Sequence, residues 1–184
     1  MSTNQQYQYI TKRIPSGYTL MELIVVMLIL AIVGSLTVRL ISSTMKTYET
    51  VLLRSEIVND ARLFSARFYR EVKPLPFPDS LLAADSKSIQ WKTNSGKQYI
   101  FTITGSTVTR QLNGGSVEVL VSHVDIANSN FTYYDSTYTL LSPLPLSLTN
   151  RKKVRILGAD IIFELGAETF TSHQRIYLAN MRRW

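Results

Sequence analysis

The sequence predicts an α+β protein, in which one long N-terminal helix packs by its second half against a C-terminal antiparallel β-sheet domain. Two observations support this prediction. No proline occurs between Tyr18 and Val72, and the apolar residues there first form an unbroken run and then recur at helical spacing. The rest of the chain is a series of short strand-like runs separated by Gly, Asn and Pro turns. A helix followed by strands that can cover one of its faces makes an α+β domain.

The N-terminal part of the helix is apolar on all sides. Every residue from Leu23 to Gly34 is apolar, and the run continues to Val38 with two hydroxyl residues in it. As a helix, residues 18–38 would cover roughly 30 Å, which is enough to cross a bilayer. A secretory signal peptide is the alternative, but its apolar part usually holds about 7–15 residues and ends at a small-residue cleavage site. No such site follows Val38, so we expect a retained membrane helix.

One charged residue, Glu22, lies near the start of this run. A carboxylate in a membrane helix costs on the order of 2 to 3 kcal/mol, so its presence calls for a partner or a task. Lys12 and Arg13 precede the run, and residues 1–17 contain no acidic residue. Such a cationic flank favours a cytoplasmic N-terminus.

The residues just before Glu22 form a pattern that gives this carboxylate a task. Residues 17–22, Gly-Tyr-Thr-Leu-Met-Glu, resemble the N-terminal signature of type IV prepilins and of the related pseudopilins of type II secretion. That resemblance implies that residues 1–17 are a leader peptide, which a prepilin peptidase removes by cutting between Gly17 and Tyr18. It also implies methylation of the new amine at Tyr18 and a role for Glu22 in subunit assembly.

The chemistry of such a cut agrees with this interpretation. An α-amine has a reference pKa near 8, so it is mostly protonated at neutral pH, and methylation leaves its charge in place. Glu22 can pair with the amine of its own chain at Tyr18 or with that of a neighbouring subunit. Pairing with a neighbouring subunit sets the register of stacked helices, because a subunit in any other register leaves both charges unpaired in apolar surroundings.

Each feature also has an ordinary explanation. Glu22 can reach the lipid headgroups, and Gly17 can be a flexible residue ahead of a helix that Ser16 caps. Small side chains within the run would let neighbouring helices approach closely, or they simply make a less hydrophobic anchor. These small residues are Ala31, Gly34 and Ser35. The complete pattern, in this order and spacing, favours the prepilin interpretation.

Residues 39–73 are expected to continue the helix with one apolar face against the globular domain. The apolar residues at helical spacing are Tyr48, Val51, Leu52, Ile57, Ala61, Phe64, Phe68 and Val72. Pro74, Pro76 and Pro78 end the helix, and residues 77–85 are predicted to be a loop.

The remaining runs predict the sheet. We expect an antiparallel meander, a further strand, a loop around Pro143 and Pro145, and a closing hairpin. The expected strands are 88–92, 97–103, 107–112, 117–121, 131–135, 154–165 and 169–178. The chain therefore divides into the leader (1–17), the membrane and filament-core helix (18–38), its amphipathic continuation (39–73) and a globular β-rich domain (74–184).

No set of residues predicts catalysis. His123 and Asp125 have the spacing of one strand face, but no nucleophile accompanies them, and a surface pair beside a strand is the simpler interpretation. His173 stands among polar neighbours and is expected to be exposed. The acidic residues are dispersed and cysteine is absent, so we predict no metal site, no cofactor and no enzymatic activity.

A basic patch suggests a binding function. Arg151, Lys152, Lys153 and Arg155 are close in sequence, and Arg182-Arg183-Trp184 would add an aromatic ring, a combination that suits phosphates and bases of nucleic acids. The net charge of +7 permits such binding but does not select it. A solvated loop and tail are the alternative.

The leading hypothesis is a structural subunit of a type IV pilus or type II secretion pseudopilus, inserted in the inner membrane with its C-terminal domain outside the cytoplasm. Its expected partners are the prepilin peptidase, membrane lipid before assembly, and other pilin or pseudopilin subunits. The missing cysteine and the proline-free helix favour a minor subunit. The second hypothesis is a pilin at the fibre tip that binds DNA or a surface through Arg151–Arg155. A membrane-anchored domain that never polymerises is a third.

Overall fold

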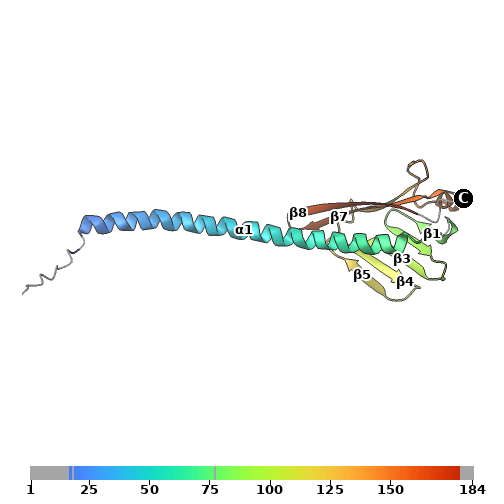
Figure 1. Ribbon diagram of the computed structural model, residues 1–184, viewed down its shortest axis with the longest axis horizontal. Coiled ribbons are helices and arrows are strands. Elements are labelled where there is room, and N and C mark those ends of the chain that lie inside the picture. The colour runs from blue at the N-terminus through green and yellow to red at the C-terminus, as the bar shows by residue number, and fades with distance from the viewer. Residues whose placement is uncertain (1–16, 18, 77, 179–184) are drawn as a thin grey trace, which may run out of the picture. The chain divides into compact units, whose positions relative to one another are not determined.

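The computed structural model describes Gly17, residues 19–76 and residues 78–178 (Figure 1). The chain forms two compact units, Met1–Thr47 and Tyr48–Trp184. The long helix α1 (Leu20–Val72) belongs by its first part to the first unit and by its second part to the other. The rest of the predicted leader, Tyr18 and the C-terminal Arg182-Arg183-Trp184 lie outside the described residues.

The first part of α1 is the expected apolar helix. Every described residue from 19 to 47 is exposed, and α1 is long and apolar enough to span a membrane. The two hydroxyl groups within the apolar run, residues 23–38, are satisfied within the helix, because Thr37 Oγ1 donates to the carbonyl of Val33 at 2.8 Å and Ser35 Oγ to that of Ile32 at 2.8 Å. These side chains therefore bring no unpaired polar group into apolar surroundings.

The second part of α1 buries one face in the globular unit. Ile57, Ala61, Phe64, Phe68 and Val72 are buried, at the spacing of three and four residues that places them on one side of a helix. The sequence predicted that this face would begin at Tyr48, but Tyr48, Val51 and Leu52 are exposed. The apolar residues of α1 continue through this stretch, but other parts of the globular unit cover the helix only from near Ile57 onward.

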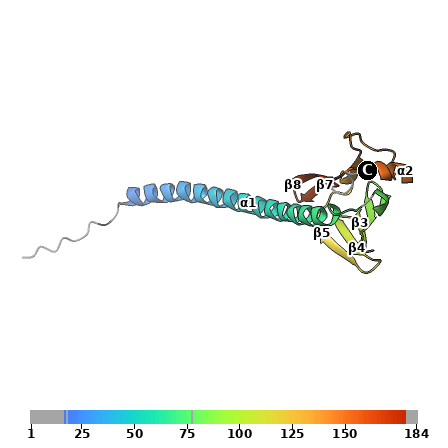
Figure 2. The ribbon, with the colours of Figure 1, turned by 45° about the vertical axis from the view of Figure 1, so that its right-hand side comes forward.

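Five strands form the first antiparallel sheet, in chain order (Figure 2). They are β1 (Leu81–Ala84), β2 (Ser88–Lys92), β3 (Gln98–Thr104), β4 (Thr107–Leu112) and β5 (Val117–Val121). The meander from β2 to β5 confirms the prediction. The segment predicted as the loop 77–85 instead holds the 3-10 turn η1 (Pro78–Ser80) and β1, which pairs with β2 through a bulge.

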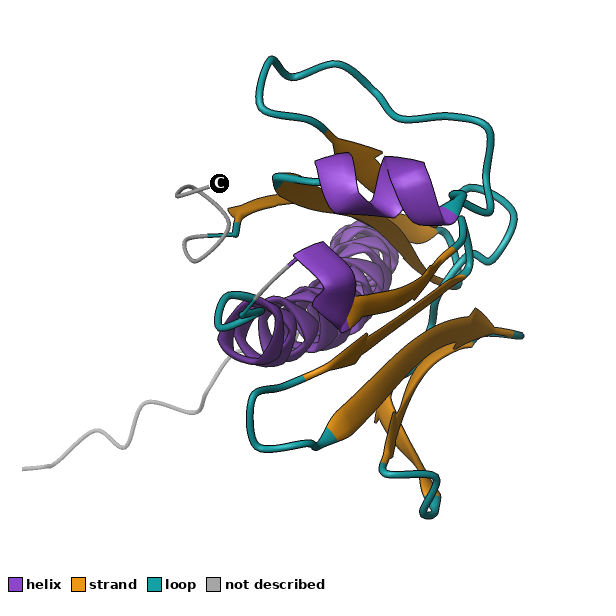
Figure 3. Cartoon of the chain, turned by 90° about the vertical axis from the view of Figure 1, so that its right-hand side faces the viewer, coloured by secondary structure: helices purple, strands orange, loops and turns teal. Residues whose placement is uncertain are grey.

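Three strands form a separate antiparallel sheet in the order β6, β7, β8 (Figure 3). They are β6 (Asn130–Tyr134), β7 (Ile156–Leu165) and β8 (Glu168–Tyr177), so the predicted closing hairpin is confirmed. Between β6 and β7 the chain forms a short helix, α2 (Leu148–Lys153), which the sequence analysis did not predict. The α+β class, with a long N-terminal helix on antiparallel sheets, is confirmed.

Phe68 of α1 joins both sheets in one core. Its ring stacks on Phe131 of β6 at 5.7 Å between centroids and meets Phe101 of β3 edge-on at 5.8 Å. Trp91 of β2 is fully buried and stacks on Phe101 at 5.2 Å. Aromatic pairs at these distances add to the free energy gained by burying their area. The second part of α1 is therefore the central element of the globular unit.

A lysine organises the loop between β5 and β6. Lys87 Nζ donates hydrogen bonds to the backbone carbonyls of Ile126 and Ser129, and it lies 3.5 Å from that of Ala127. Ser129 is fully buried, and its hydroxyl accepts a hydrogen bond from the backbone N–H of Ile162 at 2.8 Å. These contacts hold the loop against β7.

Candidate functional site

Glu22 takes part in a reciprocal cap at the start of α1. The backbone N–H of Thr19 donates to Glu22 Oε2 at 3.2 Å, and the backbone N–H of Glu22 donates to Thr19 Oγ1 at 3.3 Å. This is a capping box, which satisfies two backbone donors that a helix start otherwise leaves free. A carboxylate in the first turn is also stabilised by the positive end of the helix dipole.

The capping box changes the interpretation of this segment in one respect. Thr19 is the N-cap, whereas Ser16, the cap considered from the sequence, lies outside the described residues. The sequence contains a signal for the Thr19 cap, the spacing Thr-x-x-Glu of residues 19–22. The Glu22 carboxylate is thus directed toward the backbone N–H of Thr19, one residue after Tyr18, and a cut after Gly17 would release its amine on Tyr18.

Gly17 is exposed, and no atom of the described chain lies within 4 Å of the place where a Cβ would stand. Packing among the described residues therefore does not require a glycine there. Gly34, within the apolar run, is equally open. A missing Cβ at these positions would allow close approach of an enzyme at Gly17 or of a neighbouring helix at Gly34.

The basic patch predicted at Arg151–Arg155 lies on α2 and the residues after it. Arg151 Nη1 donates to the carbonyl of Leu81 at 3.3 Å, and Arg155 Nη1 donates to those of Lys152 and Val154 at 2.8 and 3.0 Å. Lys152 pairs with Asp79 at 3.0 Å.

Three of these four cations thus have partners within the chain. Cations in the last turn of α2 also stabilise its negative end, which gives their clustering a structural reason. The nucleic-acid or surface-binding hypothesis stays a prediction.

The pair His123 and Asp125 does not form. His123 has a left-handed backbone (φ 60°) outside the strands, and its Nδ1 lies 3.3 Å from Asp60 Oδ2 on α1. The carboxylate of Asp125 instead accepts hydrogen bonds from Ala127 N–H at 2.9 Å and from the side chain of Asn128. The expected strand-face spacing was wrong because the chain turns at His123.

The second histidine is exposed, as expected, but it has a partner. His173 Nδ1 lies 2.7 Å from Asp160 Oδ1, and Arg175 binds the same carboxylate at 2.8 and 3.0 Å. Partial burial raises the pKa of Asp160, but the hydrogen bonds from Arg175 and His173 outweigh it and hold the net pKa below the ordinary value. Among the described residues, no group of three His, Asp or Glu side chains could hold a metal ion.

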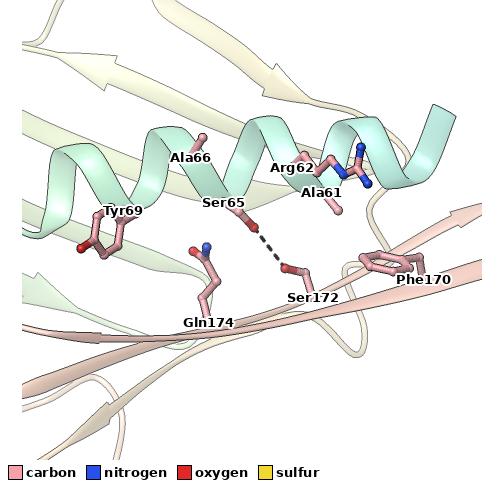
Figure 4. A pocket seen from close by; sticks show the side chains of 8 residues that line it. All are labelled: Ala61, Arg62, Ser65, Ala66, Tyr69, Phe170, Ser172 and Gln174. Carbon is pink, nitrogen blue, oxygen red and sulfur yellow. Dashed lines mark hydrogen bonds between the residues drawn. The ribbon is translucent and has the colours of Figure 1, made fainter. Parts of the chain in front are cut away.

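A groove of about 440 Å³ runs between α1 and β8 (Figure 4). The side chains that line it are Ala61, Arg62, Ser65, Ala66, Tyr69, Phe170, Ser172 and Gln174. Figure 4 shows the Ser65 and Ser172 hydroxyls bridging the groove, 3.3 Å apart. These lining residues include no histidine or carboxylate that could act as a general base for a hydroxyl, so the groove gives no support to a catalytic function.

Comparison with known proteins identifies one family model. The prokaryotic N-terminal methylation motif matches residues 13–38, which include Gly17, Tyr18, the capping box and the apolar run. No curated protein matches the chain.

Proposed function

We propose, from the premise that this chain carries the N-terminal methylation signature of type IV pilins and pseudopilins, that it is a structural subunit which polymerises through α1 into a pilus or a secretion pseudopilus. The observation that carries this proposal is the arrangement at the start of α1. The carboxylate of Glu22 accepts a hydrogen bond from the backbone of Thr19, just after the expected cut between Gly17 and Tyr18, and an exposed apolar helix follows it.

Processing supplies the partner of Glu22. A peptidase cut between Gly17 and Tyr18 releases an α-amine, and methylation keeps its positive charge. In the fibre the apolar faces of neighbouring helices exclude water, so an unpaired amine or carboxylate there is costly. Pairing Glu22 of one subunit with the amine of the next satisfies both charges and fixes the step between subunits.

The same helix serves two stages. Before assembly, its apolar part is buried in the lipid of the cytoplasmic membrane, with the globular unit outside the cytoplasm. During assembly it leaves the lipid for contact with other helices, an exchange between two apolar environments. The expectation of a minor subunit remains a prediction, which the copy number of the chain in purified fibres tests.

Glu22→Gln tests the proposal. The substitution keeps the side-chain size and removes the charge, so processing and membrane insertion should continue while incorporation into fibres falls at least tenfold. Glu49→Gln is the matched control, because Glu49 is an exposed carboxylate on the same helix beyond the apolar run. Mass spectrometry of the mature N-terminus and immunoblots of sheared fibres provide the two readouts.

Two results would contradict the proposal. One is a native N-terminus upstream of Tyr18 in protein taken from fibres or from its working location. The other is equal fibre incorporation of the Glu22→Gln and Glu49→Gln variants.

A further inference from the structure

The two ends of the globular unit, taken along the axis of α1, carry different charges. One end holds the turn between β7 and β8, where a Cβ at Gly166 would stand 3.5 Å from Leu53 of α1. From Leu53 to its last residue, Val72, α1 rises by roughly 28 Å. The other end holds α2, which Lys152 joins to Asp79 just beyond α1. Figure 2 shows α2 beyond the C-terminal end of α1.

The end with the β7–β8 turn is the acidic end. Glu164 and Glu168 flank the turn, and within the described chain neither carboxylate has a hydrogen-bond or ion-pair partner. The other carboxylates at this end have contacts within the chain. These carboxylates are Glu56, Asp60 and Asp125, and the cations at this end are Arg54, Arg62 and Lys87. Carboxylates therefore outnumber cations here, and the two at the turn are left without a partner.

The end with α2 is the basic end. Lys97, in the turn after β2, and Lys153 of α2 are exposed, and neither ammonium has a hydrogen-bond or ion-pair partner within the described chain. Two carboxylates lie at this end, where Asp79 pairs with Lys152 and Asp135 accepts hydrogen bonds from its own turn. Cations far outnumber them. These cations are Arg70, Lys73, Lys92, Lys97, Arg151, Lys152, Lys153 and Arg155.

Between the two ends, oppositely charged side chains are paired. Glu71 and Glu118 bind Arg110 at 2.9 and 3.0 Å. Asp160 binds Arg175 at 2.8 Å. The unpartnered charges of opposite sign are therefore separated along the unit, with carboxylates at the β7–β8 turn and ammonium groups at α2.

Both ends also expose apolar side chains. At the acidic end, Val51 and Leu52 of α1 are 57% and 51% exposed, although the sequence assigned them to the buried face. At the basic end, Leu148 of α2 and Leu140 in the loop before it are 60% and 54% exposed. Apolar side chains surrounded by charged ones are typical of a protein–protein interface.

A second copy of the chain fits both surfaces. The basic end alone would accept any polyanion, but a polyanion leaves the carboxylates of the acidic end without a partner. The acidic end of another copy supplies the opposite charge to the basic end and has its own charge satisfied by the same contact. Such electrostatic complementarity selects partners and sets their relative orientation.

We propose that the basic end of one globular unit docks against the acidic end of the next copy in the fibre. The proposal rests on the fibre function proposed above. The contact joins two different surfaces, so it repeats from copy to copy and produces an open array instead of a closed dimer. It involves few side chains and forms because the helices already hold the globular units at a high effective concentration.

Carbodiimide cross-linking of native fibres tests this contact directly. The reagent joins an amine to a carboxylate only where the two groups touch. Within one chain the two ends are roughly 28 Å apart, so a link between the basic and the acidic end joins two copies. Mass spectrometry of the digested fibres should identify links from Lys97 or Lys153 to Glu164 or Glu168. The monomer in detergent should give none.

Charge reversal provides a second test. The acidic-end variant carries Glu164→Lys and Glu168→Lys, and the basic-end variant carries Lys97→Glu and Lys153→Glu. Each should lower incorporation into fibres by roughly fivefold or more, because like charges then face each other across the contact. A chain with all four substitutions should recover about half of the original incorporation or more, since opposite charges face each other again.

A control separates the contact from net charge. Arg54→Glu with Arg62→Glu changes the net charge by the same amount as the basic-end variant, but both residues lie on α1 toward the acidic end. This control should assemble normally. The urea midpoint of each purified variant shows that it folds, and cross-linking of the unsubstituted chain tests the contact even where a variant does not fold.

Four outcomes would overturn the inference. The first is fibres that contain the chain but give no link between the two ends. The second is equal incorporation of the control and of either reversed variant, and the third is no recovery in the chain with all four substitutions. The fourth is a basic-end variant that assembles normally but loses binding of DNA, which would assign this end to nucleic acid.

Failure of the proposed function is distinguishable from failure of this inference. In that case the unsubstituted chain would be absent from fibres or would retain its leader. Links between the two ends would also replace the expectation of a minor subunit, since they require adjacent copies.

Discussion

The ion pairs around Arg110 permit a test of how burial sets the strength of a charge contact in this fold. Arg110 of β4 binds Glu71 of α1 through Nε at 2.9 Å and Glu118 of β5 through Nη1 at 3.0 Å. The two distances are nearly equal, but the side chain of Glu71 is 10% exposed and that of Glu118 is 49% exposed. We therefore expect substitution of Glu71 to cost more than substitution of Glu118.

The expected magnitudes follow from these environments. Glu71→Gln keeps a hydrogen-bond acceptor for Arg110 but removes the counter-charge of a mostly buried guanidinium, so the contact loses a large part of the about 1.5–3 kcal/mol that a charge-assisted hydrogen bond contributes. The loss of unfolding free energy is therefore about 1–2 kcal/mol. Glu118→Gln should lose less than about 1 kcal/mol, because water and salt screen a half-exposed pair.

Urea unfolding of the full chain in a mild non-ionic detergent measures both losses. The fluorescence of Trp91, buried against Tyr99 and Phe101, reports the transition in a Trp184→Phe background. Glu71→Gln should lower the urea midpoint by roughly 0.5–1 M. In 1 M salt the effect of Glu118→Gln should fade while that of Glu71→Gln persists. Equal losses for the two variants, or equal sensitivity to salt, would refute the reasoning.

Three further predictions use the same assay. Ser129→Ala removes a fully buried hydroxyl that accepts a hydrogen bond from the Ile162 N–H and should cost about 1–3 kcal/mol, whereas a loss below about 0.5 kcal/mol, on the order of a surface substitution, would mean that water replaces the hydroxyl. Gly158→Ala places a methyl group 2.2 Å from Thr132 Oγ1 and 2.9 Å from Arg175 Nη1 and should cost about 1–3 kcal/mol, and a neutral result would show that both side chains move away freely. The lowered pKa of Asp160 means that its contribution is complete above about pH 5 and is lost as the pH falls through the folded-state value. Asp160→Asn should therefore flatten the fall in stability on acidification, and an unchanged pH profile would contradict this role.

The helix and most strands could be predicted because their causes are local. Proline limits α1 at its C-terminal end, and alternation with Gly and Asn turns marks β2 to β5. β1 was missed since its sequence, Leu-Leu-Ala-Ala, is short, does not alternate and follows three prolines. α2 has six residues and too little periodicity to detect, although Ser147, whose hydroxyl caps it, was a usable local signal.

The contacts between distant segments could not be predicted. Asp60 meets His123, and Glu71 meets Arg110, only because α1 packs beside strands that follow it much later in the chain. Periodicity assigns a residue to a face, but it does not identify the residue opposite. For the same reason, the sequence did not indicate that Tyr138 lies exposed in a strained turn.

At the start of α1, by contrast, the useful information was in six consecutive residues, 17–22. The resemblance of residues 17–22 to a known signature agrees with the family match. Both depend on the types of the residues and their order in the sequence, and not on tertiary contacts. The capping role of Thr19 is equally local, although the sequence alone suggested Ser16 as the cap. The helix start shows which one is used, because only Thr19 is three residues ahead of Glu22.

Lys87, between β1 and β2, holds the loop between β5 and β6, and this has a consequence if the globular unit lies outside the cytoplasm, as proposed above. Backbone carbonyls that converge on one point are ligands that calcium ions commonly use in extracellular domains. Here the positive charge at the centre, the ammonium of Lys87, is covalently attached to the neighbouring strand region. Dilution or a chelator cannot remove it, so the order of this loop is independent of the ion concentration in the surrounding medium.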